Sequence, residues 1–224
     1  MANNLANANS NGFRADLMAF RSVPIRQEAA ASTRVFALEA TAGFDGTAGP
    51  LMQTGRTLDV AISGQGYFVV QGLDGVEANT RNGAFEVGTD GTLQTKSGLP
   101  VVGDGGPLVI PPGAIVSIGS DGTVSAKVGS QAATQVGRLK LTNDPVGELR
   151  KSADGLLRRV DGEPSGPGTN VSVAQGVLEG SNVNVVQAMV GMISVSRQFE
   201  MQMRMLQTAE QNEQRALNLL GNSG

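Results

Sequence analysis

The chain of 224 residues contains no cysteine, no histidine and no tryptophan. Without Cys and His it cannot hold a Ser-His-Asp or Cys-His catalytic group, a thiolate or imidazole zinc site, a disulfide, or haem or iron–sulfur ligands of those types. Only carboxylate, Lys, Arg, Tyr or Ser chemistry remains, and no pair among the 20 acidic residues is singled out. We therefore predict no catalytic, cofactor-binding or metal-binding residue and no enzymatic activity.

Long basic and long apolar runs are also missing. The net charge is −3 and no basic run is longer than Arg158-Arg159. We therefore expect no nucleic-acid partner, because binding nucleic acid needs a clustered cationic surface. The longest apolar stretch, 183–195, is interrupted by polar residues and is too short to cross a bilayer, so we expect no direct membrane insertion. Residues 1–12 hold five Asn and no cation, unlike a cleaved secretory signal.

Glycine and proline divide the chain into three parts. All nine Pro fall between Pro24 and Pro167, and most of the 31 Gly lie between residues 43 and 180. We predict an N-terminal segment over 1–33, a central β domain over 34–178 and a C-terminal helical segment over 179–224.

Asp-Gly dipeptides dominate the middle region. Seven of the ten Asp precede Gly, which predicts successive hairpins with type I′ turns. Around one such turn Val116, Ile118, Val124, Ala126 and Val128 alternate with polar residues, a pattern of one buried face. Leu58, Val60 and Ile62 alternate in the same way, as do Leu139 and Leu141. Each Asp stands alone, unlike the ligands of a calcium loop. The predicted fold class is mainly β with a long α-helix, the central antiparallel domain being flanked by the two terminal segments.

The C-terminal segment predicts one long amphipathic helix. Asn184 followed by Gln187 resembles a capping box, and no Pro occurs from there to Leu220. A 3,4 spacing that starts at Met189 is apolar at seven of ten positions, as in a coiled coil. These positions are Met189, Met192, Phe199, Met203, Leu206, Leu217 and Leu220.

The length of this helix bears on its role. About 35 residues make a helix ~50 Å long, whereas a compact domain of the central region's size has a radius of gyration of only ~14 Å. Packing of the stripe on its own domain is the simple alternative, but much of the stripe would overhang. We therefore expect it to pack against helices of other subunits.

Both ends of the chain resemble one family. The start, Ala2-Asn3-Asn4-Leu5-Ala6-Asn7 followed by Gly12-Phe13-Arg14, resembles the N-terminal signature of bacterial flagellar rod and hook proteins. The C-terminal stretches 178–184 and 197–209 resemble the terminal helix of the same family. Gly49 to Ile62, Thr80-Arg81-Asn82-Gly83 and Phe199 to Met203 resemble its proximal-rod members in particular. The motif residues are Asn3, Asn4, Leu5, Ala6, Asn7, Gly12 and Phe13.

The resemblance implies a structural subunit of the flagellar basal-body rod, exported by the flagellar type III apparatus and polymerised across the periplasm. Its partners would be copies of itself and other proximal-rod and distal-rod proteins. A distal-rod or hook-type paralogue, a soluble β-rich ligand-binding module and a carboxylate-dependent enzyme are the alternatives. Family members usually carry an amphipathic helix before the N-terminal signature, whereas this chain begins at Met1, so we expect that translation starts further upstream.

Overall fold

The computed structural model describes residues 1–24 and 35–221, with side chains described for 1–17, 43–212 and 215. Two helices and eighteen strands make up this part of the chain. The helices are α1 (Ala2–Ala6) and α2 (Val185–Gly221), with a 3-10 turn at Val146–Glu148. The first nine strands are β1 (Asp16–Pro24), β2 (Val35–Phe44), β3 (Leu51–Gln53), β4 (Val60–Ser63), β5 (Tyr67–Gln71), β6 (Glu77–Thr80), β7 (Phe85–Val87), β8 (Leu93–Thr95) and β9 (Val102–Gly103). The others are β10 (Gly106–Pro107), β11 (Ala114–Ile118), β12 (Thr123–Val128), β13 (Thr134–Arg138), β14 (Leu141–Thr142), β15 (Leu149–Lys151), β16 (Leu157–Arg159), β17 (Ser172–Gln175) and β18 (Val177–Glu179).

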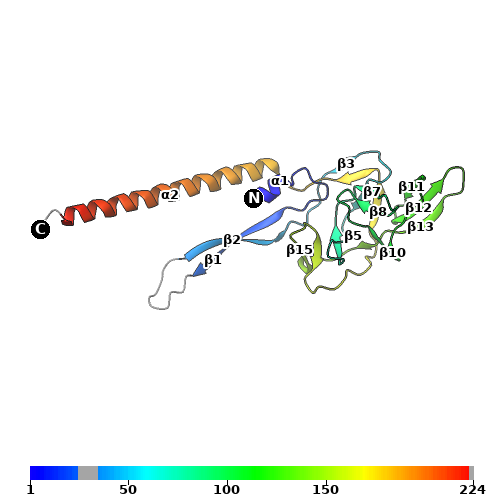
Figure 1. Cartoon of the computed structure of the whole chain (residues 1–224), viewed down its shortest axis with the longest axis horizontal. Helices are drawn as coiled ribbons and strands as arrows, with labels where there is room; N and C mark the ends of the chain where they lie inside the picture. Colours follow the sequence, from blue (N-terminus) through cyan, green and yellow to red (C-terminus); the bar gives the residue numbers. More distant parts are fainter. Residues whose placement is uncertain (25–34, 222–224) are drawn as a thin grey trace.

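The molecule has three parts in space. A compact β domain lies at one end of the molecule. Helix α2 and the β1–β2 hairpin both project from the same side of this domain towards the other end of the molecule (Figure 1). The predicted class, mainly β with one long C-terminal helix, is confirmed. The predicted boundary between residues 33 and 34 falls within 25–34, outside the described residues.

Every pair of hydrogen-bonded strands that the structure describes is antiparallel. The largest sheet has five strands in the order β14-β5-β6-β16-β15, and a three-stranded sheet β11-β12-β13 forms the end of the domain far from α2 (Figure 1). Four two-stranded ribbons, β3–β18, β4–β17, β7–β8 and β9–β10, complete the domain. Short strands joined by tight turns are what the dense glycine and Asp-Gly content predicts.

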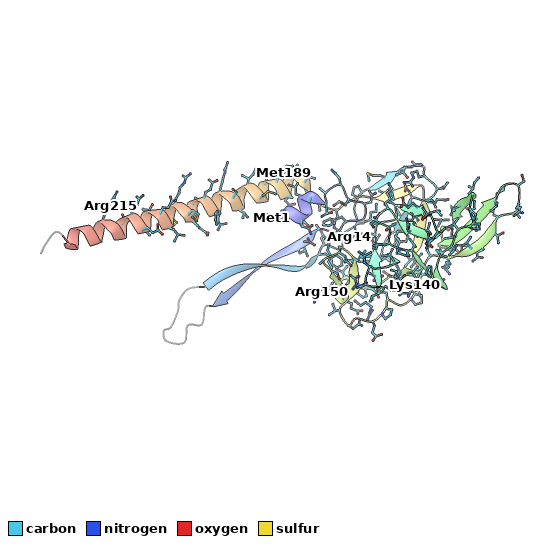
Figure 2. The ribbon with its side chains drawn as sticks, viewed as in Figure 1. Met1, Arg14, Lys140, Arg150, Met189 and Arg215 are labelled. Carbon is cyan, nitrogen blue, oxygen red and sulfur yellow. The ribbon has the colours of Figure 1, made fainter. Side chains whose placement is uncertain are left out.

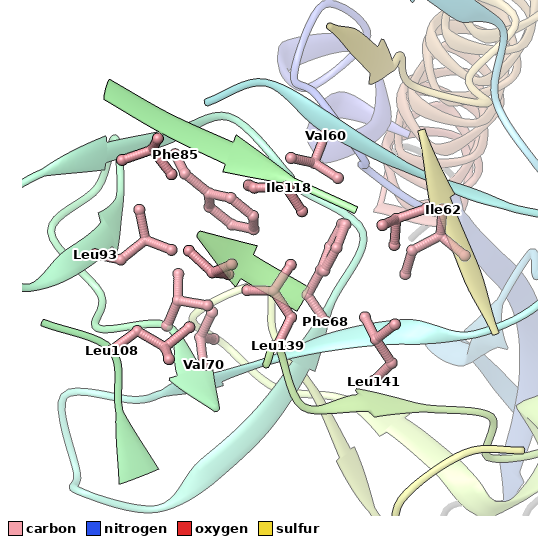
Figure 3. Close-up of a cluster of buried hydrophobic side chains, with 14 of the residues drawn as sticks. Val60, Ile62, Phe68, Val70, Phe85, Leu93, Leu108, Ile118, Leu139 and Leu141 are labelled. Atoms are coloured by element: carbon pink, nitrogen blue, oxygen red, sulfur yellow. The ribbon is translucent and has the colours of Figure 1, made fainter. Parts of the chain in front are cut away.

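The hydrophobic core lies between these sheets. Phe68 and Phe85 meet edge to face at its centre, with ring centroids 5.2 Å apart, and aliphatic side chains surround them (Figure 3). The predicted inward residues Val116, Ile118 and Val124 are buried. The prediction that Val128 also faces inward is wrong. Val128 is 38% exposed, because β12 runs beyond the core into its terminal turn.

The β4 region is buried more completely than one-sided alternation predicted. Val60 and Ile62 are buried, but so are Asp59 and Ala61, which alternate with them, each with 1% exposure. The prediction of a solvent-facing side is wrong here because β4 passes through the interior of the domain. Asp59 pairs there with Arg56, whose Nη1 lies 3.2 Å from the Asp59 Oδ1.

Five Asp-Gly turns share one geometry, in which the glycine alone has a positive φ. At the β11–β12 turn the N–H of Gly122 donates to the carbonyl of Gly119, and the Asp121 carboxylate accepts from the N–H of Thr123. The predicted type I′ geometry is wrong, because among the described residues Asn170 is the one non-glycine with a positive φ. These are type I turns ended by a left-handed glycine. The other four lie at Gly72–Gly75, Gly88–Gly91, Ser152–Gly155 and Arg159–Gly162.

Candidate assembly site

Helix α2 begins where its capping residue predicts. The side-chain oxygen of Asn184 accepts a hydrogen bond of 3.0 Å from the N–H of Gln187, which satisfies one of the free donors of the first turn. The 37 residues that follow run away from the β domain (Figure 1). Figure 2 shows Met189 at the root of this helix and Arg215 far along it, with side chains standing out all around its surface.

The predicted apolar stripe of α2 is open to solvent. Met189 is 47% exposed, Phe199 63% and Leu206 59%, and Met192 and Met203 are also exposed. Helix α2 includes Leu217 and Leu220, but the structure does not describe their side chains. From Met189 to Leu206, where its side chains are described, the stripe therefore does not pack on the domain of its own chain, which is the overhang that the helix length predicted.

Further apolar side chains lie outside the 3,4 stripe. Val186, Val190, Ile193 and Val195 are all at least 47% exposed. With the stripe residues they make the first four turns of α2 apolar over most of the circumference. The prediction of a single heptad stripe did not include these residues. The high density of Val, Ile and Met between 185 and 195 is the sequence feature that indicates a wider apolar surface. A helix that is apolar on most sides is normally buried on most sides.

The N-terminal motif residues form an internal clamp. Asn4 uses its side-chain amide to bond both backbone groups of Asp16: its Nδ2 donates to the Asp16 carbonyl, and its Oδ1 accepts from the Asp16 N–H at 2.7 Å. Asn3 donates to the Asp16 carboxylate at 2.6 Å, and Asn7 donates back to Asn3. Because Asp16 is the first residue of β1, this clamp sets where the β1–β2 hairpin leaves the domain.

The apolar members of the motif lie in the same region and are buried to different degrees. Leu5 is half-buried and Ala6 is exposed on α1, which lies against the start of α2. A Cβ at Gly191 would lie 3.0 Å from the end of the Met1 side chain, so that side chain would have to shift. Phe13 lies under the Lys151 ammonium, which is 3.7 Å from its ring centroid.

Gly12 joins the motif to the central domain. Its φ is +68°, and a Cβ at this position would lie 2.3 Å from the carbonyl carbon of Arg81. Its N–H donates to the backbone carbonyl of Glu179 at 2.8 Å. The N-terminal motif and the Thr80–Gly83 motif are thus in backbone contact, which no local pattern in either motif indicated.

A buried ion cluster lies beside Gly12. Glu179 accepts at 2.9 Å from Arg81, and its other carboxylate oxygen is 2.6 Å from the Arg14 guanidinium. All three side chains are at most 5% exposed. The Arg14 contact is ionic rather than a well-aligned hydrogen bond, and Arg14 Nε and Nη2 have no hydrogen-bond partner among the described residues. The N–H of Gly49 also donates to Glu179. Two cations therefore share one buried carboxylate.

Tyr67 completes the cluster. The Arg81 guanidinium lies 5.4 Å from the centroid of its ring. Burial raises the pKa of the Tyr67 phenol, and burial lowers the pKa of the Arg81 guanidinium, an effect that the Glu179 carboxylate opposes. The sequence analysis did not predict that these residues form one cluster. The only indication in the sequence is that Arg14, Arg81 and Glu179 are charged residues within motifs of mostly small, apolar or uncharged residues.

Asn182 ties the root of α2 to the root of the hairpin. Its Oδ1 accepts from the N–H of Ala15 at 2.7 Å, and its Nδ2 donates to the carbonyls of Asp45 and Thr47. With the Glu179 cluster, these bonds join three segments: 12–16, 44–49 and 179–184. The arrangement is a rigid junction from which two long projections leave the domain.

The described residues offer little for chemistry. They contain no group of three or more acidic side chains placed to hold a metal ion. None of the helices described is both long and apolar enough to cross a bilayer. The features with functional character are the exposed helix α2 and the junction that orients it.

Comparison with known proteins agrees with this geometry. Residues 174–219 match the C-terminal domain model of flagellar basal-body rod FlgEFG proteins, and residues 61–126 match the D1 domain model of flagellar hook proteins FlgE/F/G. The flagellar basal-body rod protein FlgF of Salmonella typhimurium is 44% identical over 99% of this chain and 91% of its own length. FlgF of Escherichia coli K12 is 42% identical over the same shares.

A rod protein of the FlgG type is less similar to the chain than these two FlgF proteins are. FlgG of Buchnera aphidicola subsp. Schizaphis graminum is 32% identical over 98% of this chain and 92% of its own length. The distal-rod and hook-type alternatives are therefore not favoured, and a soluble binding module or an enzyme is not favoured either, because the relatives are structural proteins. The chain belongs to the FlgF family of flagellar basal-body rod proteins and is a structural subunit of the bacterial flagellar basal-body rod.

Proposed function

We propose that this subunit polymerises through α2, with copies of itself and with other rod proteins as neighbours, and that the rod so formed transmits torque across the periplasm. The observation that carries the proposal is the exposed apolar surface of α2 between Val186 and Leu206. Burying a Leu, Met, Val or Phe side chain contributes ~1.5 to 3 kcal/mol. A surface with so many of these groups is strongly stabilised by neighbouring helices.

The distribution of apolar residues supports neighbours on more than one side. The stripe through Met189, Phe199 and Leu206 suits a coiled-coil partner. Val186, Val190 and Ile193 border that stripe and extend the apolar surface further around the helix, which suits a second neighbour. Five of the eight Met lie between Met189 and Met205, and Met packs adaptably against surfaces that differ from one another.

The junction supports this role by fixing the directions of the projections. Glu179 and Asn182 hold the start of α2 to the Gly12–Asp16 segment, so a load on α2 passes into the β domain through several bonds. We place the β domain on the outside of the rod, with α2 towards its axis. Export through the flagellar type III apparatus is part of the same proposal.

The test compares substitutions on and off the stripe. Phe199→Asp and Leu206→Asp each place a carboxylate in the proposed interface, which is costly without a partner. We expect the association constant to fall by about 10-fold to 100-fold, the equivalent of ~1.5 to 3 kcal/mol. Gln198→Asp introduces the same charge on an exposed polar position of the same helix and serves as the control.

Two readouts decide the outcome. Sedimentation velocity over a concentration series measures association, and swimming in soft agar measures rod function when each variant is supplied to a strain lacking the gene. Loss of both with Phe199→Asp, and their retention with Gln198→Asp, is the expected result. Normal association and swimming with both stripe variants would overturn the proposed role of α2.

A further inference from the structure

We propose that an uncharged turn at the far end of the β domain, residues 129–133, docks into a neutral polar cleft beside α1 on the next copy of this chain. The inference rests on the proposed function, because it requires copies to meet in a polymer. It adds a second contact, between β domains, to the one made by α2. We call residues 129–133 the tip turn and the hollow beside α1 the motif cleft.

The motif cleft is about 580 Å³ in volume and lies between the N-terminal motif and the central domain. Asn7, Ser10 and Asn11 line one side, and Asn82, Thr95 and Ser152 lie among the residues of the other. Amide and hydroxyl groups therefore dominate its walls.

The charges in the motif cleft are already paired. Asp16 accepts from the Lys151 ammonium at 2.7 Å, and Asp154 lies 2.8 Å from the Arg158 guanidinium. Bringing a further charge into this space would desolvate it without a free partner. The cleft therefore selects an uncharged occupant.

Several hydrogen-bonding groups in the motif cleft remain available. Among the described residues, the Asn11 side chain, the Asn82 Nδ2 and the Ser152 hydroxyl make no hydrogen bond within the chain, although all three residues are half-buried. Amide nitrogens and hydroxyls donate to carbonyl oxygens. A turn with exposed backbone carbonyls supplies such acceptors.

The tip turn has the complementary chemistry. It joins β12 to β13 with the sequence Gly-Ser-Gln-Ala-Ala, and each of its residues is exposed. The hairpin turns between β5 and β6, β7 and β8, β9 and β10, β11 and β12, and β15 and β16 all contain an Asp. Of the described turns between paired neighbouring strands, the tip turn is thus the uncharged one, and Ser130 and Gln131 add polar groups of their own.

The positions of the two features favour contact between copies. The tip turn is at the end of the domain far from α2, whereas the motif cleft lies beside α1 on the opposite side (Figure 1). A tip therefore cannot enter the cleft of its own chain. Tip-into-cleft contact joins two different surfaces, a head-to-tail arrangement that repeats without closing. Five small residues bury far less than the ~1,200 Å² of a stable interface, so the contact orders neighbours that α2 holds together.

The absence of cysteine makes the test direct. Full-length chains carrying Gln131→Cys and Asn11→Cys, one of them tagged, are mixed at a concentration where the unaltered chain associates, and then oxidised. A disulfide forms only where the two Cα atoms approach to about 4.4–6.8 Å. The control pair is Leu73→Cys with Asn11→Cys, because Leu73 is 93% exposed on another turn.

We expect at least ten times more mixed disulfide from the Gln131 pair than from the Leu73 pair. We also expect Ala132→Glu, added to the Gln131→Cys chain, to reduce that yield to the control level, whereas Ala132→Ser should preserve it. Equal yields from the two pairs, or a yield unaffected by Ala132→Glu, would overturn the inference.

The outcomes separate this inference from the proposed function. If the chain associates through α2 but the Gln131 pair does not cross-link, the proposed function stands and the tip contact is wrong. If no association occurs at any concentration, both fail. Binding of a neutral sugar such as cellobiose, seen as shifts of the Asn11 and Asn82 amide resonances of the monomer, would assign the motif cleft to a saccharide and overturn the tip contact.

Discussion

The carboxylate of Glu179 lies 2.6 Å from the guanidinium of Arg14, and both side chains are almost completely buried. The two residues are at opposite ends of the chain and precede its two projections, the β1–β2 hairpin and α2. This ion pair joins the roots of both projections to the β domain.

Removing the charge of Glu179 should strongly destabilise the fold. Glu179→Gln leaves Arg14 and Arg81 as buried cations without a counter-charge, and breaking such a pair costs ~3 to 5 kcal/mol. We expect the free energy of unfolding, measured with urea, to fall by that amount. The control is Glu77→Gln at the partly exposed Lys140 pair, which should cost at most ~1 kcal/mol. Similar losses in the two variants would contradict a special role for the cluster.

Gly12→Ala should be among the most damaging small substitutions. The left-handed backbone costs an Ala ~1 to 3 kcal/mol, and the new Cβ would also collide with the Arg81 backbone. Gly147→Ala is the matched control, since its φ is not positive and no atom lies near its Cβ position. Thermal unfolding of both variants is the measurement. A Gly12→Ala chain as stable as the Gly147→Ala chain would refute the backbone contact.

Asn4→Ala should loosen the root of the hairpin without unfolding the domain. The change removes two hydrogen bonds to Asp16, each worth ~0.5 to 1.5 kcal/mol. We expect faster amide hydrogen exchange at Asp16, and unchanged exchange in β5. Asn9→Ala, at an exposed position, should leave both rates unaltered. Unchanged exchange at Asp16 in the Asn4 variant would show that the clamp contributes nothing.

Acid should weaken the Asp-Gly turns. The Thr123 hydroxyl and N–H lower the pKa of Asp121, and the Thr92 N–H and hydroxyl lower the pKa of Asp90, both from an ordinary value of 3.8. Because the folded pKa lies below the unfolded one, the stabilisation is present above pH 3.8 and is lost as the pH falls through the folded value. Asp121→Asn keeps the acceptor oxygen but cannot titrate. We expect its unfolding free energy to depend less steeply on pH between about 4 and 2 than that of the unaltered chain; equal slopes would exclude Asp121 as a contributor.

Local patterns in the sequence determined much of the fold. The period-2 alternation around Asp121-Gly122 predicted the β11–β12 hairpin, and Asn184 with the Pro-free stretch after it predicted the start of α2. Both depend on residues close together in the chain, where steric limits and capping bonds act directly. The turn type was wrong because Asp-Gly is compatible with several geometries, and the surrounding strands select among them.

The terminal motifs show where local patterns stop being sufficient. Sequence resemblance identified Asn3, Asn4 and Gly12 as belonging to a motif, but their contacts with Asp16, Arg81 and Glu179 join segments far apart in the chain. Nothing in local spacing encodes such pairings, because they depend on how the strands pack. The sequence by itself determined the absence of thiol and imidazole chemistry, the strand-rich middle and the long apolar helix. Only the tertiary structure decided that Arg14, Arg81 and Glu179 share one buried site, since burial and distance are properties of the packed chain.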